Sequence, residues 1–303
     1  MILVTGAAGF CGSRIVSLLG NEGIATRGLV RNPEKAKGRL PEQGVEVVTG
    51  DTTQPETLEA AVAGVETIIH TAFITAERKQ GPGVNYYDTN VLGTANLVEA
   101  ARKAGVRRIV VLSGLGTKSD KPGTYMHGRY LAEQAVKQSG LAWSILGPSI
   151  QFGKGSAFFN GLADLIRTMP VIVPMVGDGK TRFQPIWVDD VAACIVKMVN
   201  KPEAYDGRTI EVGGPEYFTY AQILDMLMET LHKKRIKVPG PMPFVRLGAG
   251  MMEAVMPKPP ITRAATGLFT FENIADLDAV AKYFGIQPMS LWAYLQEHGV
   301  EKA

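Results

Sequence analysis

The stretch Ile2-Leu3-Val4-Thr5-Gly6-Ala7-Ala8-Gly9-Phe10-Cys11-Gly12 decides the fold of this chain. Its apolar start predicts a buried strand, and a helical pattern opens at Gly12. Gly6 permits a tight turn, Gly9 lets backbone N–H groups approach a pyrophosphate, and Gly12 lets the helix pack close to the strand. The N-terminus of that helix adds partial positive charge. The stretch therefore predicts a dinucleotide-binding turn, in preference to a glycine-rich surface turn without a ligand.

Short β-branched runs alternate with helical patterns through the first half of the chain. Strands are expected at Ile2–Thr5, Thr26–Val30, Val45–Val48, Thr67–Thr71, Arg108–Leu112 and Ala142–Leu146. Helices are expected near Gly12–Gly20, Pro55–Val62, Thr89–Ala104 and Thr124–Ser139. Continuous apolar strands separated by helices predict a parallel sheet that is covered on both faces. We therefore expect an α/β fold with a doubly wound parallel sheet.

The pattern changes after Gly147-Pro148, where glycine, phenylalanine and proline breakers become frequent. A helix is expected to begin near Asp189, with the Asp189 carboxylate as its cap, before a strand at Arg208–Val212. Thr219 is expected to open another helix, over Tyr220–Leu231.

These changes predict two domains. Residues 1–150 are expected to bind the dinucleotide, with residues 184–213 packing back onto them, and residues 151–303 to form a smaller, mostly helical domain for substrate or a partner. Within the second domain, the apolar segment Phe244–Met256 either rests on a membrane surface or partner subunit, or packs against the protein's own sheet. Because only Arg246 and Lys258 lie nearby as basic anchors, we expect burial against the sheet.

The composition excludes several classes of protein. The 303 residues carry 32 Lys and Arg against 29 Asp and Glu, a net charge of +3, which is too balanced for a general nucleic-acid binder. The two cysteines have no disulfide-framework or metal-ligand spacing, so we expect no bound metal. No signal-peptide pattern and no membrane-spanning apolar run occur, so we expect a cytoplasmic protein.

The choice of dinucleotide depends on the end of the second expected strand. An NAD site wants an acidic residue there to accept from the ribose 2′-hydroxyl, and none lies between Gly23 and Pro33. Arg31 stands there instead, with Arg14 and Lys35 as further cations, and a guanidinium matches a 2′-phosphate. We therefore expect NADP(H) rather than NAD(H), the alternative being that Arg31 is a solvated loop residue. Asp51 either accepts from the adenine amino group or forms a turn.

Four further segments carry a resemblance to a known family. They are Asp88–Leu97, Ile109–Gly114, Tyr125-Met126-His127-Gly128-Arg129 and Phe183–Ala192. With the glycine stretch, they resemble the short-chain dehydrogenase/reductase superfamily, in its extended and atypical branches. In detail they resemble the atypical group of NmrA-like redox sensors, isoflavone-reductase-like enzymes and the dehydrogenase-like accessory subunit of respiratory complex I. The glycine stretch and the residues from Gly177 to Ala192 are most similar to that accessory subunit.

The resemblance implies a Rossmann sheet, with substrate in a cleft between the sheet and the C-terminal domain. It places the family's Ser-Tyr-Lys site on Ser113, Tyr125 and Arg129, where arginine replaces lysine, and gives Asn90 an ordering role. The expected cofactor-binding residues are Gly6, Ala8, Gly9, Phe10, Cys11, Gly12, Arg14, Arg31, Asp51, Thr52, Thr71, Ala72 and Asn90.

Tyr125 and Arg129 are four residues apart and so share a helix face. A free tyrosine has a pKa of about 10, and a cation one helical turn away lowers it toward the range that proton transfer needs. Ser113 follows a strand at the edge where parallel sheets present active-site groups, and its hydroxyl is expected to hold the substrate oxygen. Arginine keeps the charge of lysine but is broader and planar, which puts contact with the nicotinamide ribose in doubt.

Other polar residues have simpler interpretations. We expect His127 to lie on a different helix face from Tyr125, His70 to pack beside the cofactor without titrating, and Cys11 to pack rather than act as a redox thiol.

The sequence thus favours an NADP(H)-binding reductase of a small, largely apolar carbonyl or enone compound, with Tyr125 as proton donor. The alternative is a cofactor-binding sensor or accessory protein, without turnover, that acts in a larger complex such as a respiratory one. A small-molecule substrate is expected and nucleic acid is not. Contact with a membrane surface or a protein complex stays open.

Overall fold

The computed structural model describes residues 1–76, 84–119, 124–257, 259 and 261–301, and these fall into two compact units. The first unit comprises the described residues within Met1–Ile74, Pro82–Gly147 and Val188–Glu211. The second comprises those within Thr75–Gly81, Pro148–Trp187 and Val212–Ala303. The segment expected to return to the first domain, 184–213, overlaps the third stretch of the first unit.

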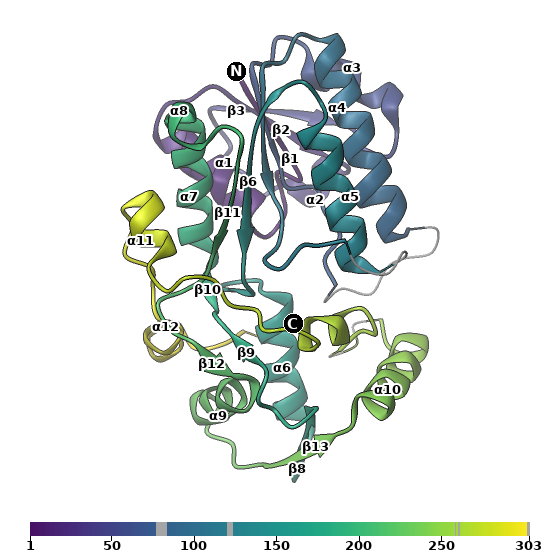
Figure 1. Cartoon of the computed structure of the whole chain (residues 1–303), viewed down its shortest axis with the longest axis vertical. Coiled ribbons are helices and arrows are strands. Elements are labelled where there is room, and N and C mark those ends of the chain that lie inside the picture. The colour runs from purple at the N-terminus through teal and green to yellow at the C-terminus, as the bar shows by residue number, and fades with distance from the viewer. Residues whose placement is uncertain (77–83, 120–123, 258, 260, 302–303) are drawn as a thin grey trace. The chain divides into compact units, whose positions relative to one another are not determined.

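A seven-stranded sheet forms the centre of the first unit, in the order β11-β6-β5-β4-β1-β2-β3 (Figure 1). Its strands are β1 (Ile2–Thr5), β2 (Thr26–Val30), β3 (Val45–Thr49), β4 (Thr67–His70), β5 (Arg108–Leu112), β6 (Ala142–Pro148) and β11 (Arg208–Val212). Strands β1 to β6 pair in parallel. Strand order reverses between β1 and β4, and the carboxyl ends of parallel strands at such a reversal are where nucleotides bind in open α/β sheets.

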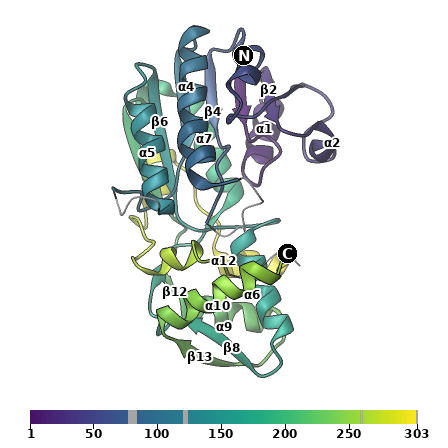
Figure 2. The same ribbon diagram turned by 90° about the vertical axis from the view of Figure 1, so that its right-hand side faces the viewer.

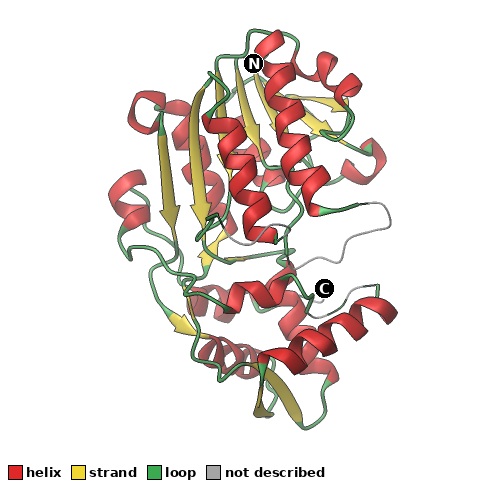
Figure 3. Ribbon diagram, turned by 45° about the vertical axis from the view of Figure 1, so that its right-hand side comes forward, coloured by secondary structure: helices red, strands yellow, loops and turns green. Residues whose placement is uncertain are grey.

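Helices cover both faces of this sheet, as the ribbons coloured by secondary structure show (Figure 3). The longer helices are α1 (Gly12–Asn21), α4 (Gly93–Lys103), α5 (Tyr125–Lys137) and α7 (Val188–Asn200). The shorter ones are α2 (Pro33–Ala36), η1 (Pro55–Thr57), α3 (Leu58–Val62) and α8 (Pro202–Tyr205). Helices α1 and α7 pack together, as do α4 and α5. The expected doubly wound Rossmann fold with a helical C-terminal region is confirmed.

Two helix starts differ from expectation. The helix expected from Thr89 begins as a π-helical turn, η2 (Tyr87–Leu92), before α4, and such turns occur frequently at functional sites. Asp189 lies inside the first turn of α7 rather than capping it, and its carboxylate lies 2.7 Å from the Arg14 guanidinium. Thr219, by contrast, caps its helix through a complete capping box with Gln222.

The second unit combines helices with three two-stranded sheets (Figure 2). Its helices are α6 (Ala157–Thr168), α9 (Tyr220–Thr230), α10 (Met242–Val255), η3 (Ala265–Phe269), α11 (Ala279–Phe284) and α12 (Leu291–His298). Its strands are β7 (Gln151–Phe152), β8 (Ile172–Val176), β9 (Arg182–Phe183), β10 (Ile186–Trp187), β12 (Phe218–Thr219) and β13 (Ile236–Gly240).

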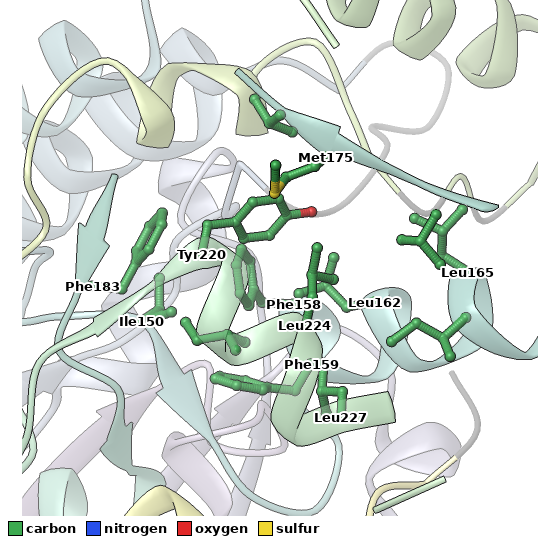
Figure 4. Packing of buried hydrophobic residues seen from close by; sticks show 14 of the residues in the cluster. Ile150, Phe158, Phe159, Leu162, Leu165, Met175, Phe183, Tyr220, Leu224 and Leu227 are labelled. Atoms are coloured by element: carbon green, nitrogen blue, oxygen red, sulfur yellow. The ribbon is translucent and has the colours of Figure 1, made fainter. Parts of the chain in front are cut away.

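Aromatic and aliphatic side chains from α6, α9 and the neighbouring strands form the core of the second unit (Figure 4). Phe183 is fully buried and packs edge-on against Phe269, which in turn packs edge-on against Tyr220. Such pairs add to the free energy gained by burying the rings. Helix α10 contributes little to this core.

The expected burial of Phe244–Met256 against the sheet is wrong. Phe244 and Val255 keep 71% and 80% of their surface exposed. Of the residues of α10, only the small Ala249 and Gly250 are buried, and the helix packs against η3. None of the helices in the described part of the chain has the length and hydropathy of a membrane-spanning segment.

Candidate dinucleotide and proton-transfer site

The turn after β1 has no room for side chains at its glycines. Gly6 adopts a left-handed conformation (φ 66°), and a Cβ on it would lie 3.0 Å from the Cα of Ala72. A Cβ on Gly9 would lie 2.8 Å from the carbonyl oxygen of Gly6, and one on Gly12 would overlap that same oxygen. Three glycines therefore allow β1, α1 and the loop after β4 to touch through their backbones.

The start of α1 presents hydrogen-bond donors to an anion. Within the described residues, the backbone N–H groups of Phe10, Cys11 and Gly12 donate to no acceptor. The helix has no side-chain cap and no acidic residue in its first turn. Free N–H groups and the positive end of the helix dipole together form a phosphate site. These residues fit the pyrophosphate of a dinucleotide, which Ala8 and Gly9 would approach from the turn.

Thr71 and Ala72 form the other wall of this turn. The Thr71 hydroxyl donates to the Thr5 carbonyl at 2.7 Å, which ties the carboxyl end of β4 to that of β1. The expected cofactor residues on these two loops are thus brought together.

The cations expected to select a 2′-phosphate have different environments. Arg31 is exposed directly after β2. Arg14 pairs with Asp189 and donates to the Phe10 carbonyl at 2.5 Å, so its guanidinium already has partners. Arg39, which the sequence did not single out, donates to the Ala8 carbonyl at 3.3 Å and so adds a cation beside the turn.

Asp51 and Thr52 follow β3. The Asp51 carboxylate accepts from the backbone N–H and the hydroxyl of Thr53, both at 2.9 Å, which is the turn-forming interpretation. Its contact with adenine stays a prediction. Thr52 is buried, and its carbonyl accepts from the Asn96 side chain at 3.0 Å.

A buried hydrogen-bond chain runs behind the turn through His70. Its Nδ1 lies 2.7 Å from the Thr5 hydroxyl and its Nε2 lies 3.0 Å from the Thr94 hydroxyl. Because Thr94 donates its own proton to the Asn90 carbonyl at 2.6 Å, it accepts from Nε2, and Thr5 donates to Nδ1. The network thus assigns a neutral His70 with its proton on Nε2. Burial, with a smaller contribution from the charge of Arg129, lowers the pKa of His70 from 6.5 to about 3.

Asn90, in the π-helical turn, is fully buried. Its side-chain amide accepts from the Ile74 N–H at 2.8 Å and donates to the Ile74 carbonyl at 3.0 Å. It therefore orders the loop that follows β4.

Arg129 and Tyr125 form a directed pair on α5. The Arg129 Nε donates to the Tyr125 hydroxyl at 3.0 Å, and a terminal nitrogen of the same group donates to the Leu112 carbonyl at 3.0 Å. The guanidinium also lies over the Phe73 ring, 4.5 Å from its centroid. Arg129 is buried, and no carboxylate of the described residues pairs with it, so its charge acts on Tyr125 without a counter-ion.

Ser113 has a partner that the sequence did not indicate. Its hydroxyl donates to the Glu133 carboxylate at 2.6 Å, and Glu133 accepts from Lys137 at 3.2 Å. Both Ser113 and Glu133 are buried. Arg129, Glu133 and Lys137 recur every four residues along one face of α5, and this spacing is the signal that could have identified Glu133.

The side chains of two remaining residues have other environments. Cys11 is buried, and burial raises the pKa of its thiol to about 12, so it is not a reactive thiolate. His127 stacks on Tyr130, with ring centroids 6.3 Å apart.

Comparison with known proteins identifies the family. The model of a family described as NAD(P)H-binding matches residues 6–202. The chain belongs to this NAD(P)H-binding family. The predicted resemblance to atypical, NmrA-like short-chain dehydrogenases/reductases is confirmed with it.

Two relatives and one solved structure are similar to most of this chain. The chain is 31% identical to the NAD(P)H azoreductase of Xenophilus azovorans over 230 residues, which cover 74% of this chain and 71% of that protein. It is 24% identical to the mitochondrial NADH dehydrogenase 1 alpha subcomplex subunit 9 of Arabidopsis thaliana, over 89% of this chain and 68% of that protein. It superimposes on the triphenylmethane reductase of Citrobacter sp. complexed with NADP(H) with a TM-score of 0.75, at 25% identity, over 98% of this chain and 99% of that one.

Replacing Gly12 by alanine is expected to weaken NADPH binding about 100-fold, because the new Cβ would push α1 away from the Gly6 carbonyl and separate the phosphate donors. Gly20→Ala is the matched control, since a Cβ at Gly20 of the same helix meets nothing within 4 Å. Fluorescence titration measures the affinity, and circular dichroism checks that both variants fold. A folded Gly12→Ala protein with wild-type affinity would contradict the phosphate assignment.

Acid is expected to destabilise the protein through His70. The unfolded chain protonates this histidine below pH 6.5, whereas the folded chain resists until about pH 3. The stabilising contribution is therefore complete above pH 6.5 and is lost as the pH falls toward 3. Between pH 7 and 4, the free energy of unfolding should fall by about 3 kcal/mol more in the wild type than in His70→Gln. Urea denaturation measures this difference, and His298→Gln, at a partly exposed position, should behave like the wild type.

Proposed function

We propose that the protein is an NADPH-dependent reductase of small, apolar carbonyl or enone compounds, with Tyr125 as the proton donor. The observation that supports this most directly is the hydrogen bond from the buried Arg129 guanidinium to the Tyr125 hydroxyl. A structural tyrosine on a helix needs no such unbalanced charge beside its oxygen. A proton donor does, because the charge stabilises the phenolate left after transfer.

When bound, NADPH supplies the hydride for the reduction. Tyr125 gives its proton to the substrate oxygen, and Arg129 holds the resulting negative charge. Because His70 is neutral, it adds no second positive charge beside Arg129. The Arg129 Nε donates its hydrogen bond to the Tyr125 hydroxyl.

Ser113 is proposed to orient the substrate oxygen by turning its hydroxyl proton from Glu133 to the substrate. Glu133 would keep its contact with Lys137 at 3.2 Å, which limits the cost of the exchange. Tyr86 packs edge-on against Tyr125, with centroids 5.4 Å apart, and the Phe73 ring lies against the Arg129 guanidinium. These rings favour an aromatic, apolar substrate, in keeping with the azo and triphenylmethane compounds named for two similar proteins.

NADP(H) is proposed as the preferred dinucleotide because Arg31 follows β2 with an exposed guanidinium, and no acidic residue lies between Gly23 and Pro33. Arg14 is a weaker candidate for the 2′-phosphate, since it is paired with Asp189.

A second function is favoured by a specific observation. The Ser113 hydroxyl already donates its proton to the Glu133 carboxylate. While that hydrogen bond is kept, Ser113 does not donate to a substrate oxygen, and the chain would hold the dinucleotide without turnover. The similarity to a complex I subunit supports an accessory or sensing role of this kind.

Arg31→Glu is expected to weaken NADPH binding at least about tenfold and to change NADH binding little, because the carboxylate repels a 2′-phosphate and can accept from a 2′-hydroxyl. Titration with both dinucleotides measures the ratio of the two dissociation constants. Arg107→Glu, at an exposed arginine far from the turn in sequence, should leave that ratio unchanged. A wild-type preference for NADH would contradict the NADP(H) proposal.

Tyr125→Phe is expected to lower kcat about 100-fold or more while the NADPH dissociation constant stays within about threefold of the wild type. Tyr130→Phe, on the same helix, should retain the wild-type kcat. Steady-state oxidation of NADPH against a panel of carbonyl and enone compounds measures both. Turnover that survives in Tyr125→Phe would overturn the assigned proton donor, and tight NADPH binding without turnover on any compound would favour the accessory role.

A further inference from the structure

One face of α10 carries a stripe of exposed apolar side chains. Its members are Phe244, Leu247, Met251 and Val255, with 71%, 62%, 60% and 80% of their surface exposed. The spacing of three, four and four residues puts them on one side of the helix. The two charged residues of α10 do not interrupt this stripe. Glu253 pairs with Arg263, and Arg246 donates to the Thr266 hydroxyl.

A second apolar surface lies on the two-stranded sheet that leads into α10. In the β8–β13 pair, Ile236 lies opposite Ile172 and Val238 lies opposite Pro174. All four of these side chains are exposed, as is Val171 before β8. Strand β13 ends at Gly240 and α10 begins at Met242, so the two apolar surfaces are joined by a single residue (Figure 2).

Positive charge is concentrated in the same segment. Residues 232–271 contain seven lysines and arginines and one acidic residue, whereas the whole chain has a net charge of only +3. Lys233, Lys234 and Arg235 stand directly before β13, and none of the three forms an ion pair with a carboxylate of the described residues. The rest of the chain is therefore net negative, and this segment joins a concentration of basic residues to exposed apolar side chains.

We propose that this segment of the second unit docks on an anionic phospholipid bilayer. The α10 stripe enters the interface between headgroups and acyl chains, while Lys233, Lys234 and Arg235 contact lipid phosphates. A hydrocarbon surface suits the stripe because its side chains offer no hydroxyl, amide or carboxylate, whereas a protein interface of similar size needs several hydrogen bonds. A second copy of this chain is disfavoured, because a two-fold contact would bring two basic segments together.

Co-sedimentation with vesicles tests the proposal. The wild type is expected to bind vesicles of phosphatidylcholine with 30% phosphatidylserine, about tenfold or more tightly than vesicles of phosphatidylcholine alone. The double variants Phe244→Ser with Leu247→Ser, and Lys233→Glu with Lys234→Glu, should each weaken binding to the anionic vesicles about tenfold. All of these side chains are exposed, so the variants should keep the wild-type melting temperature.

Two control variants separate this surface from general effects. Leu277→Ser removes an exposed apolar side chain elsewhere in the second unit. Lys103→Glu with Lys201→Glu makes the same change of net charge on the first unit. Both should bind like the wild type.

The proposal is overturned if the wild type does not bind the anionic vesicles, or if the Phe244 and Leu247 variant binds them unchanged. Light scattering of the wild type tests the alternative that a second copy of the chain binds this surface. A dimer that Phe244→Ser with Leu247→Ser dissociates, together with no vesicle binding, would assign the surface to a second copy.

Discussion

The backbone contact between the glycine turn and the loop after β4 is the constraint on which the first unit depends. Gly6 meets Ala72, and Gly12 meets the Gly6 carbonyl, at separations that leave no space for a single side-chain carbon. This contact holds the start of α1 against the reversal point of the sheet, with its N–H groups free. Strands β1 and β4, which precede the two loops, are also joined by the buried hydrogen bond between the Thr5 hydroxyl and His70. The phosphate site and the buried histidine are thus two results of one close packing.

Buried charge is the second organising feature. Two buried basic groups close together cannot both be charged at low cost, and here His70 is neutral while Arg129 keeps its charge. The cost of burying Arg129 is reduced by the Leu112 carbonyl and the Phe73 ring rather than by a carboxylate. One turn further along α5, the sign changes, and Glu133 is held between Ser113 and Lys137. Helix α5 therefore contacts the end of β5 through two groups of opposite charge. Arg129 donates to the Leu112 carbonyl, and Glu133 accepts from the Ser113 hydroxyl.

Features that depend on local pattern could be predicted from the sequence. The seven strands of the large sheet follow from apolar runs, and the glycine turn follows from the spacing of Gly6, Gly9 and Gly12. Features that depend on distant partners could not. Asp189 fits a helix cap in sequence, but its carboxylate lies against Arg14, 175 residues earlier. The roles of Glu133 and Arg39 likewise depend on groups, Ser113 and Ala8, that only the fold brings to them. The exposure of Phe244 could not be predicted because an apolar helical stripe has the same pattern whether or not another surface covers it.

The edge of the sheet imposes an order on folding. Strand β11 pairs with β6, although about 60 residues, most of them from the second unit, separate the two in the chain. During synthesis at about 5–20 residues per second, β6 would present an unpaired edge for roughly 3–12 s before β11 emerges from the ribosome. The first unit is therefore not complete until the stretch Pro148–Trp187 of the second unit has been made. The β6 edge of the nascent chain therefore needs protection, by chaperones or by rapid elongation. A chain whose sheet is formed from one continuous segment needs less of it.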